Sequence, residues 1–158
     1  MKVSPKEMLD LTKSMQKNID KTKSLAVAVG LPLGEATSKI YDDGTTVVQV
    51  GSYHEYGTSK IPMRSFLRVP FTVKGAAIVK ALAIAYRDVF EKGIPAETQL
   101  EKVGAFLQNI SREAFSNSGF GSWKALKPGT IKAKGSSGTL IDTGTLKGSI
   151  TYEVRNAS

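Results

Sequence analysis

The chain has 158 residues with a formal net charge of +8, no cysteine and one histidine. This composition excludes disulfides, thiolate metal sites, cysteine nucleophiles and histidine clusters, so we expect neither a cofactor nor a metal. The length predicts a single domain over residues 1–158.

No apolar run approaches the roughly 20 residues that span a bilayer, and the start lacks the apolar core of a signal peptide, so we expect a cytoplasmic location. The basic charge favours an acidic partner such as nucleic acid, although it also serves solubility.

The first predicted element is an N-terminal amphipathic helix within residues 1–23. Ser4 can cap this helix, Pro5 suits its first turn, and Glu7 completes a capping box. At helical spacing, one face carries Met8, Leu11, Met15 and Ile19. Because this face lacks Trp and Phe, docking on a core or on a neighbouring subunit is favoured over binding to a membrane surface.

Four strands are predicted from β-branched residues and from alternation of apolar and polar residues. The first runs from Leu25 to Val29. The next two, Thr37–Tyr41 and Thr45–Tyr53, flank an Asp-Gly turn that is typical of antiparallel hairpins. The last, Ser149–Val154, closes the sheet.

Two central helices follow the predicted hairpin. The spacing of apolar residues predicts the first from Thr72 to about Lys92 and the second from about Ala96, with Gly93 and Pro95 between them. The predicted fold class is therefore α+β: a small antiparallel sheet packed against two central helices, with an N-terminal amphipathic helix and long loops.

The segment from residue 116 to 139 is predicted to be an extended flexible loop, because it is long and rich in Gly, Ser and Lys. Trp123 and Leu126 are expected to hold part of it against the body of the protein. Ordering such a loop costs entropy. We therefore expect the loops over residues 57–68 and 119–139 to be poorly ordered in the free protein and ordered in an assembly.

Three patterns that resemble catalytic motifs favour structural roles. Asp142-Thr143-Gly144 matches the aspartic-protease sequence, but such an enzyme needs a second lobe or a dimer, and too little chain follows to complete the site. Asp142 is instead expected to cap a short helical turn through Leu146. Residues 119–124 fit neither a P-loop nor a dinucleotide fingerprint. His54 and Glu55, as neighbours on a predicted strand, would point to opposite faces and form no acid–base pair. No catalytic residue is predicted.

Two separated sets of residues carry a family resemblance. The first set is Glu55, Gly57, Thr58, Ser59, Lys60, Ile61, Pro62, Arg64, Phe66 and Leu67. The second set is Trp123, Leu126, Lys127, Pro128, Thr130, Ile131, Lys134, Leu140, Ile141, Asp142, Thr143, Gly144, Leu146, Ser149 and Ile150. In this order they resemble the signature of the tail-completion and neck proteins of long-tailed bacteriophages, a group that includes the virion-morphogenesis family. The chain departs from the signature at residues 63–66, Met-Arg-Ser-Phe, where family members often have Ala-Arg-Pro-Phe.

The resemblance implies a non-enzymatic structural protein of the virion. Such a protein forms a ring, six-fold by analogy, at the head–tail junction or the head-proximal end of the tail, and acts in neck and tail completion and in head–tail joining. Its partners would be further copies of itself, other neck and tail proteins and, without sequence preference, genomic DNA in the lumen. Before assembly it would lie in the host cytoplasm. The alternative is a basic DNA-binding or packaging accessory protein, and a small hydrolase built on Asp142 is a further competitor.

The resemblance also assigns candidate residues to three roles. An apolar anchor with an arginine rim is expected at interface hot spots. The predicted subunit interface comprises Glu55, Tyr56, Gly57, Arg64, Phe66, Leu67 and Arg68. The predicted DNA-facing residues of the lumen are Lys124, Lys127, Lys132 and Lys134. The predicted structural motif comprises Trp123, Leu140, Asp142 and Gly144.

Overall fold

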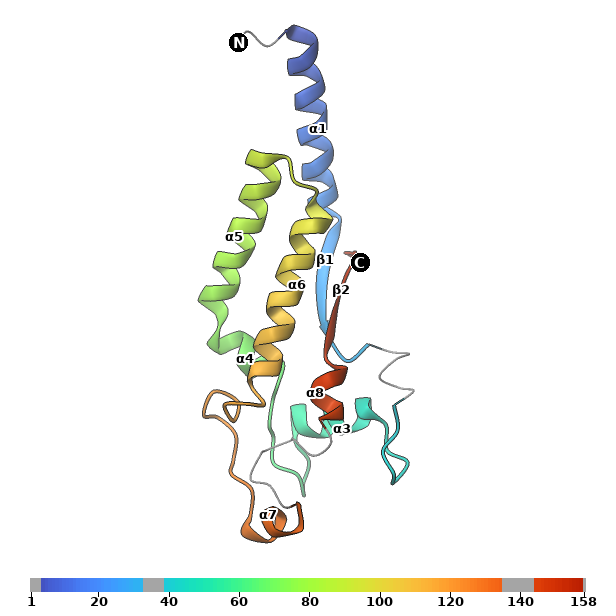
Figure 1. The fold of residues 1–158 in the computed structure, drawn as a ribbon, viewed down its shortest axis with the longest axis vertical. Coiled ribbons are helices and arrows are strands. Elements are labelled where there is room, and N and C mark those ends of the chain that lie inside the picture. Colours follow the sequence, from blue (N-terminus) through green and yellow to red (C-terminus); the bar gives the residue numbers. More distant parts are fainter. Residues whose placement is uncertain (1–3, 33–38, 135–143, 158) are drawn as a thin grey trace. The chain divides into compact units, whose positions relative to one another are not determined.

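The chain folds as an α+β protein in which a two-stranded antiparallel sheet packs against helices, which confirms the predicted fold class (Figure 1). The structure is a computed structural model that describes residues 4–32, 39–134 and 144–157. In chain order, its elements are α1 (Pro5–Lys23), β1 (Leu25–Gly30), α3 (Val47–Tyr56), α4 (Arg68–Val73), α5 (Gly75–Lys92), α6 (Ala96–Glu113), α7 (Pro128–Lys134), α8 (Thr145–Ser149) and β2 (Thr151–Asn156).

The contacts within the chain divide it into two compact units. The first unit combines residues 1–28, 76–104 and 153–158, and the second combines residues 29–75 and 105–152. The single domain expected from the length stays a prediction.

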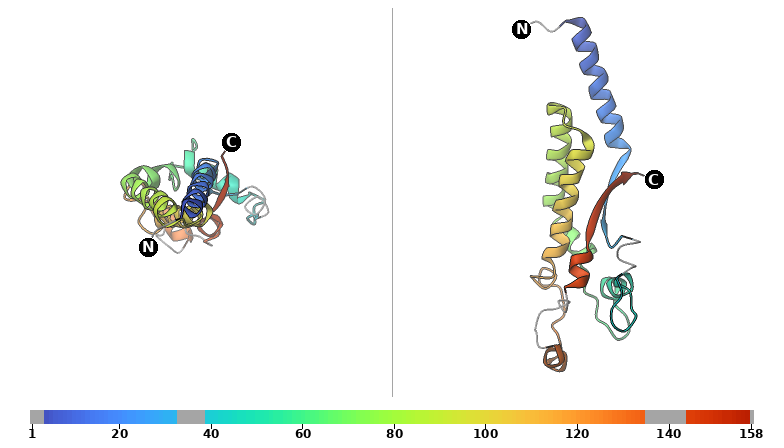
Figure 2. Two further views of the ribbon diagram at one scale, coloured as in Figure 1. Left: turned by 90° about the horizontal axis from the view of Figure 1, so that it is seen from above. Right: turned by 45° about the vertical axis from the view of Figure 1, so that its right-hand side comes forward.

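The first unit contains α1, α5 and the start of α6. The predicted capping box of α1 is confirmed: the Glu7 N–H donates to Ser4 Oγ at 3.3 Å, and the Ser4 N–H donates to Glu7 Oε2 at 2.8 Å. α5 and the first part of α6 lie side by side as a helical hairpin (Figures 1 and 2). Its buried apolar residues are Ala85, Val89, Ala96, Leu100 and Val103. This hairpin confirms the two predicted central helices, although α5 begins at Gly75, three residues later than predicted, and residues 68–73 before it form the separate short helix α4.

The sheet contains two strands among the described residues, β1 and β2. The Ala157 N–H donates to the Ser24 carbonyl at 2.8 Å just beyond the strand ends. Both strands fall within or close to the predicted segments, and β2 begins at Thr151, two residues later than expected.

The predicted strand Thr45–Tyr53 is wrong, because residues 47–56 form the helix α3. The Asp-Gly turn before it is present, since the Tyr41 N–H donates to the Thr45 carbonyl at 2.9 Å and a single antiparallel bridge joins Ile40 to Thr46. The chain becomes helical directly after that bridge. The Gln49 N–H donates to Thr46 Oγ1 at 3.2 Å, and Gln49 Oε1 accepts the Thr46 N–H at 2.9 Å, which forms a second capping box.

An aromatic cluster forms the core of the second unit. Phe66 and Phe115 have ring centroids 5.5 Å apart, and Phe115 meets Trp123 edge to face, also at 5.5 Å. The other buried members are Val47, Ala114, Leu146 and Ile150. The cluster therefore joins helix α3, the loop before α4, the end of α6 and the α8 segment.

The segment from 116 to 139 is not extended in its described part. It forms tight turns up to Trp123 and then the helix α7. Gly119 has a φ of +64°, and a Cβ atom at this position would collide with the Trp123 ring. Trp123 holds the turn to the body as predicted, with only 7% of its surface exposed. Residues 135–139 lie outside the described residues.

Candidate functional site

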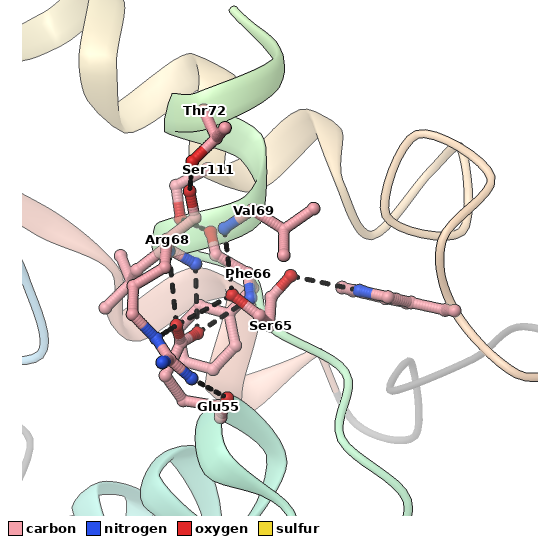
Figure 3. Close-up of polar contacts among 9 residues, drawn as sticks. Glu55, Ser65, Phe66, Arg68, Val69, Thr72 and Ser111 are labelled. Carbon is pink, nitrogen blue, oxygen red and sulfur yellow. Dashed lines mark hydrogen bonds and ion pairs between the residues drawn. The ribbon is translucent and has the colours of Figure 1, made fainter.

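The candidate site is centred on the carboxylate of Glu55, in the last turn of α3. Its side chain is 5% exposed. Glu55 Oε1 accepts from Ser65 Oγ at 2.7 Å, from the Arg68 N–H at 3.1 Å and from Arg68 Nε at 2.9 Å. Glu55 Oε2 accepts the N–H groups of Phe66 at 2.8 Å and Leu67 at 3.0 Å. Figure 3 shows these bonds converging on one side chain.

This network explains how α4 begins without a local cap. Leu67 at the N-cap makes no side-chain cap bond, so the first N–H groups of α4 need other acceptors. Glu55 supplies the acceptor for Arg68, and Ser65 Oγ accepts the Val69 N–H at 3.0 Å. Glu55 therefore links the end of α3 to the start of α4 by hydrogen bonds and holds the loop between them in place.

Glu55 is ionised at neutral pH. Burial alone would raise the pKa of this carboxyl, but hydrogen bonds from Ser65, Arg68 and Leu67 outweigh burial and hold the pKa below its ordinary value of 4.5. The Arg68 side chain makes two further contacts: its Nη2 donates to the Glu55 backbone carbonyl at 2.8 Å, and its guanidinium lies over the Tyr56 ring, 4.5 Å from the ring centroid.

The loop between α3 and α4 is also attached to the chain around Trp123. Arg64 Nη2 donates to the Lys124 carbonyl at 3.1 Å, and Trp123 Nε1 donates to the Ser65 carbonyl at 3.0 Å. Ser111 Oγ donates to the Phe66 carbonyl at 2.7 Å. Trp123 of the second signature set therefore bonds to the loop that carries the first set.

The structure corrects the predicted subunit interface in three places. Phe66 is 1% exposed in the aromatic cluster, so it is a core residue and not a surface anchor. Glu55 and Arg64 are also buried, with 4% and 7% of their surface exposed. Both hydrogen-bond to groups of the same chain and so hold the turn from α3 into α4. Gly57 and Leu67 are half-buried.

The accessible part of the predicted interface is smaller. Tyr56 is 67% exposed, the Arg68 side chain is 55% exposed, and Met63 of the same loop is 52% exposed. We call Tyr56, Met63 and Arg68 the loop surface. Gly57 keeps the loop close to α3, because its φ is +75° and a Cβ atom there would lie 3.0 Å from the Met63 nitrogen. Aromatic, Met and Arg side chains are the types enriched at protein interfaces.

The predicted DNA-facing lysines lie on and before α7. Lys124, Lys127 and Lys132 are exposed, while the side chain of Lys134 lies outside the described part of the chain. Of the predicted structural motif, Gly144 precedes α8 with a φ of +76°. The predicted turn through Leu146 is present as α8. Leu140 and Asp142, with its expected capping role, lie outside the described residues.

Sequence reasoning missed two buried serines of the network, Ser65 and Ser111, with 2% and 0% exposure. Ser65 stands where the family signature often has proline. Its hydroxyl donates to Glu55 and accepts from Val69, two bonds that a proline ring cannot make. The departure from the signature was the available signal, although Ser65 lies three residues before the first residue of α4 and therefore outside the usual N-cap position.

Within residues 4–32, 39–134 and 144–157, no group of three His, Asp or Glu side chains could hold a metal ion. In the same part of the chain, no helix is both long and apolar enough to cross a bilayer. Comparisons with models of protein families, with curated proteins and with solved structures found no match to this chain.

Proposed function

We propose that the chain is a structural, non-enzymatic protein of a tailed bacteriophage that forms a ring at the head–tail junction or the head-proximal end of the tail. The observation that carries this proposal is the meeting of the two signature sets. Phe66 from the first set packs in the same buried cluster as Trp123, Leu146 and Ile150 from the second. Residues far apart in the sequence thus act as one unit, as expected if a single family fold underlies the resemblance.

The bonding of Glu55 supports an architectural role for the centre of the signature. All its hydrogen bonds go to the chain's own loop and helix start. Its lowered pKa keeps it charged at neutral pH, which is unsuited to a general base that must exchange protons near neutrality. The network instead sets the position of the loop surface, Tyr56, Met63 and Arg68.

In this proposal, identical copies close the ring, and the resemblance implies six of them. Other neck and tail proteins bind the ring, which acts in tail completion and in joining heads to tails. The protein lies in the host cytoplasm before assembly and in the virion afterwards. The loop surface makes contacts between subunits, with Tyr56 as its most exposed aromatic residue.

The test is complementation of a phage from which the gene for this chain has been deleted. We expect unjoined heads and tails from the deletion, joined particles with the wild-type chain, and few joined particles with Tyr56→Ala. Loss of a hot spot of about 2 kcal/mol weakens association about 30-fold. Ile40→Ala is the matched control, because Ile40 is 62% exposed in the same unit and outside the loop surface. Normal joining without the chain would refute the proposal.

A basic DNA-binding or packaging accessory protein is the second candidate. The exposed Lys124, Lys127 and Lys132 and the net charge of +8 favour it. The deletion distinguishes the two candidates, since an accessory protein would leave heads joined to tails but poorly filled with DNA. Salt-sensitive retention of DNA by the isolated chain would then support this second candidate.

A further inference from the structure

Helix α1 carries an apolar face that the rest of its own unit leaves open. Met8, Leu11 and Met15 recur on one side of the helix and are 58%, 60% and 40% exposed. Every residue from Ser4 to Lys17 is exposed. The N-terminal half of α1 extends past the turn between α5 and α6 in Figure 1 and in the right-hand view of Figure 2. A helical segment of this length is marginal in water without packing, so a partner that covers this face would stabilise it.

Helix α5 of the same unit carries a second open apolar face. Val79, Tyr86 and Phe90 are 67%, 39% and 38% exposed. Their spacing places them on one side of the helix, apart from the buried Ala85 and Val89. The Tyr86 and Phe90 rings are stacked, with centroids 6.4 Å apart and planes inclined by 13°. They form a flat aromatic surface on the exposed side of α5.

We propose that the apolar face of α1 in one copy packs along the apolar face of α5 in the next copy. This contact rests on the proposed function and adds a second surface between neighbouring subunits, beside the loop surface. A heterologous ring requires two different contact surfaces on each chain. In such a ring, the α1 face of each copy would contact the α5 face of the next copy, so that both faces of every copy are covered. A single different partner on α1 would leave the α5 face open.

The chemistry and the dimensions of the two faces are complementary. Methionine side chains adapt their shape and make favourable contacts between sulfur and aromatic rings, so Met8 and Met15 suit the stacked rings of Tyr86 and Phe90. At a rise of about 1.5 Å per residue, the α1 face from Met8 to Met15 is about 10 Å long and the α5 face about 16 Å, so the first fits along the second. A membrane surface would use the α1 face and leave the α5 face without a role.

The test places a charge on each face and then mixes the two variants. Leu11→Asp disables the α1 face and Tyr86→Asp the α5 face. Each variant alone is expected to associate at least about 30-fold more weakly than the wild type in sedimentation velocity from micromolar to near-millimolar concentration. An equimolar mixture retains one intact pair of faces, so it is expected to associate more tightly than either variant alone.

The chain offers matched controls on the same two helices. Leu9 is 54% exposed on another side of α1, and Ile84 is 41% exposed on another side of α5. Leu9→Asp and Ile84→Asp are expected to assemble like the wild type. Circular dichroism checks that all four variants retain their helices.

Three results would overturn this contact. The first is a wild-type chain that stays monomeric throughout the concentration range, and the second is assembly unaffected by either face variant. The third is a mixture that associates no more tightly than either variant alone, or a Tyr86→Asp variant that associates on its own, as it would if α1 paired with α1. None of these results decides head–tail joining. If joining in the deletion phage is restored equally by the wild type and by both face variants, the proposed function stands and the α1–α5 contact fails.

Discussion

Replacing Glu55 with Gln is expected to lower the free energy of unfolding by about 1–3 kcal/mol. The amide removes the negative charge that faces Arg68 and replaces one carboxylate acceptor with a donor. Some of the N–H groups of Phe66, Leu67 and Arg68 would then be buried without an acceptor. Urea denaturation at neutral pH measures the change.

Glu97→Gln is the control for this variant. Glu97 is 59% exposed and pairs with Lys21 at 3.1 Å, and exposed ion pairs contribute about 0–1 kcal/mol. A loss for Glu55→Gln no larger than that for Glu97→Gln would contradict the role assigned to the carboxylate.

The same pair of proteins gives a pH test with a defined sign. The folded-state pKa of Glu55 lies below the ordinary 4.5, so its ionised form stabilises the fold fully above pH 4.5. That contribution disappears as the pH falls through the lowered pKa. The stability advantage of the wild type over Glu55→Gln should therefore shrink below pH 4.5, and an advantage that stays constant into strong acid would contradict the network.

Phe66→Ala is expected to destabilise the second unit by about 3–5 kcal/mol, because it leaves a cavity between Phe115 and the rest of the aromatic cluster. Phe66→Leu should cost less, since it fills more of that space. Thermal unfolding of the monomer, at low concentration, measures both variants. Unchanged unfolding combined with weakened assembly would show that Phe66 acts as a surface anchor after all.

The helices with a capping box or a regular apolar pattern could be predicted from the sequence. The capping box at Ser4 and Glu7 fixes the start of α1, and the apolar spacing in residues 75–113 fixes α5 and α6. In these segments, local preference and the final packing agree, which is why the sequence pattern suffices.

Helix α3 could not be predicted from propensity because its valines favour strands. Val47 is completely buried in the aromatic cluster, so tertiary packing overrides the local preference. The capping signature from Thr46 to Gln49 marked a helix start and carried more information than the β-branched residues after it. The misassigned strand also hid the role of Glu55, since only the last turn of a helix aims this carboxylate at the N–H groups of α4.

In the stretch predicted as the subunit interface, the sequence could not show which side chains are buried. An aromatic residue beside arginines is common at interfaces, and composition alone cannot distinguish Phe66, which is buried, from Tyr56, which is exposed. The acceptors for Arg64 and Trp123 come from residues about sixty positions away, so their pairing depends on the fold.

The most direct test of the proposed function is an electron cryomicroscopy reconstruction of the neck and upper tail of the phage that encodes this chain. The expected map contains a closed ring of this chain at the head–tail junction or the head-proximal tail end, with Tyr56 at the boundary between neighbouring copies. Intact, infectious particles that contain no copy of the chain, shown by mass spectrometry of the purified virion and by a neck map filled by other proteins, would contradict it.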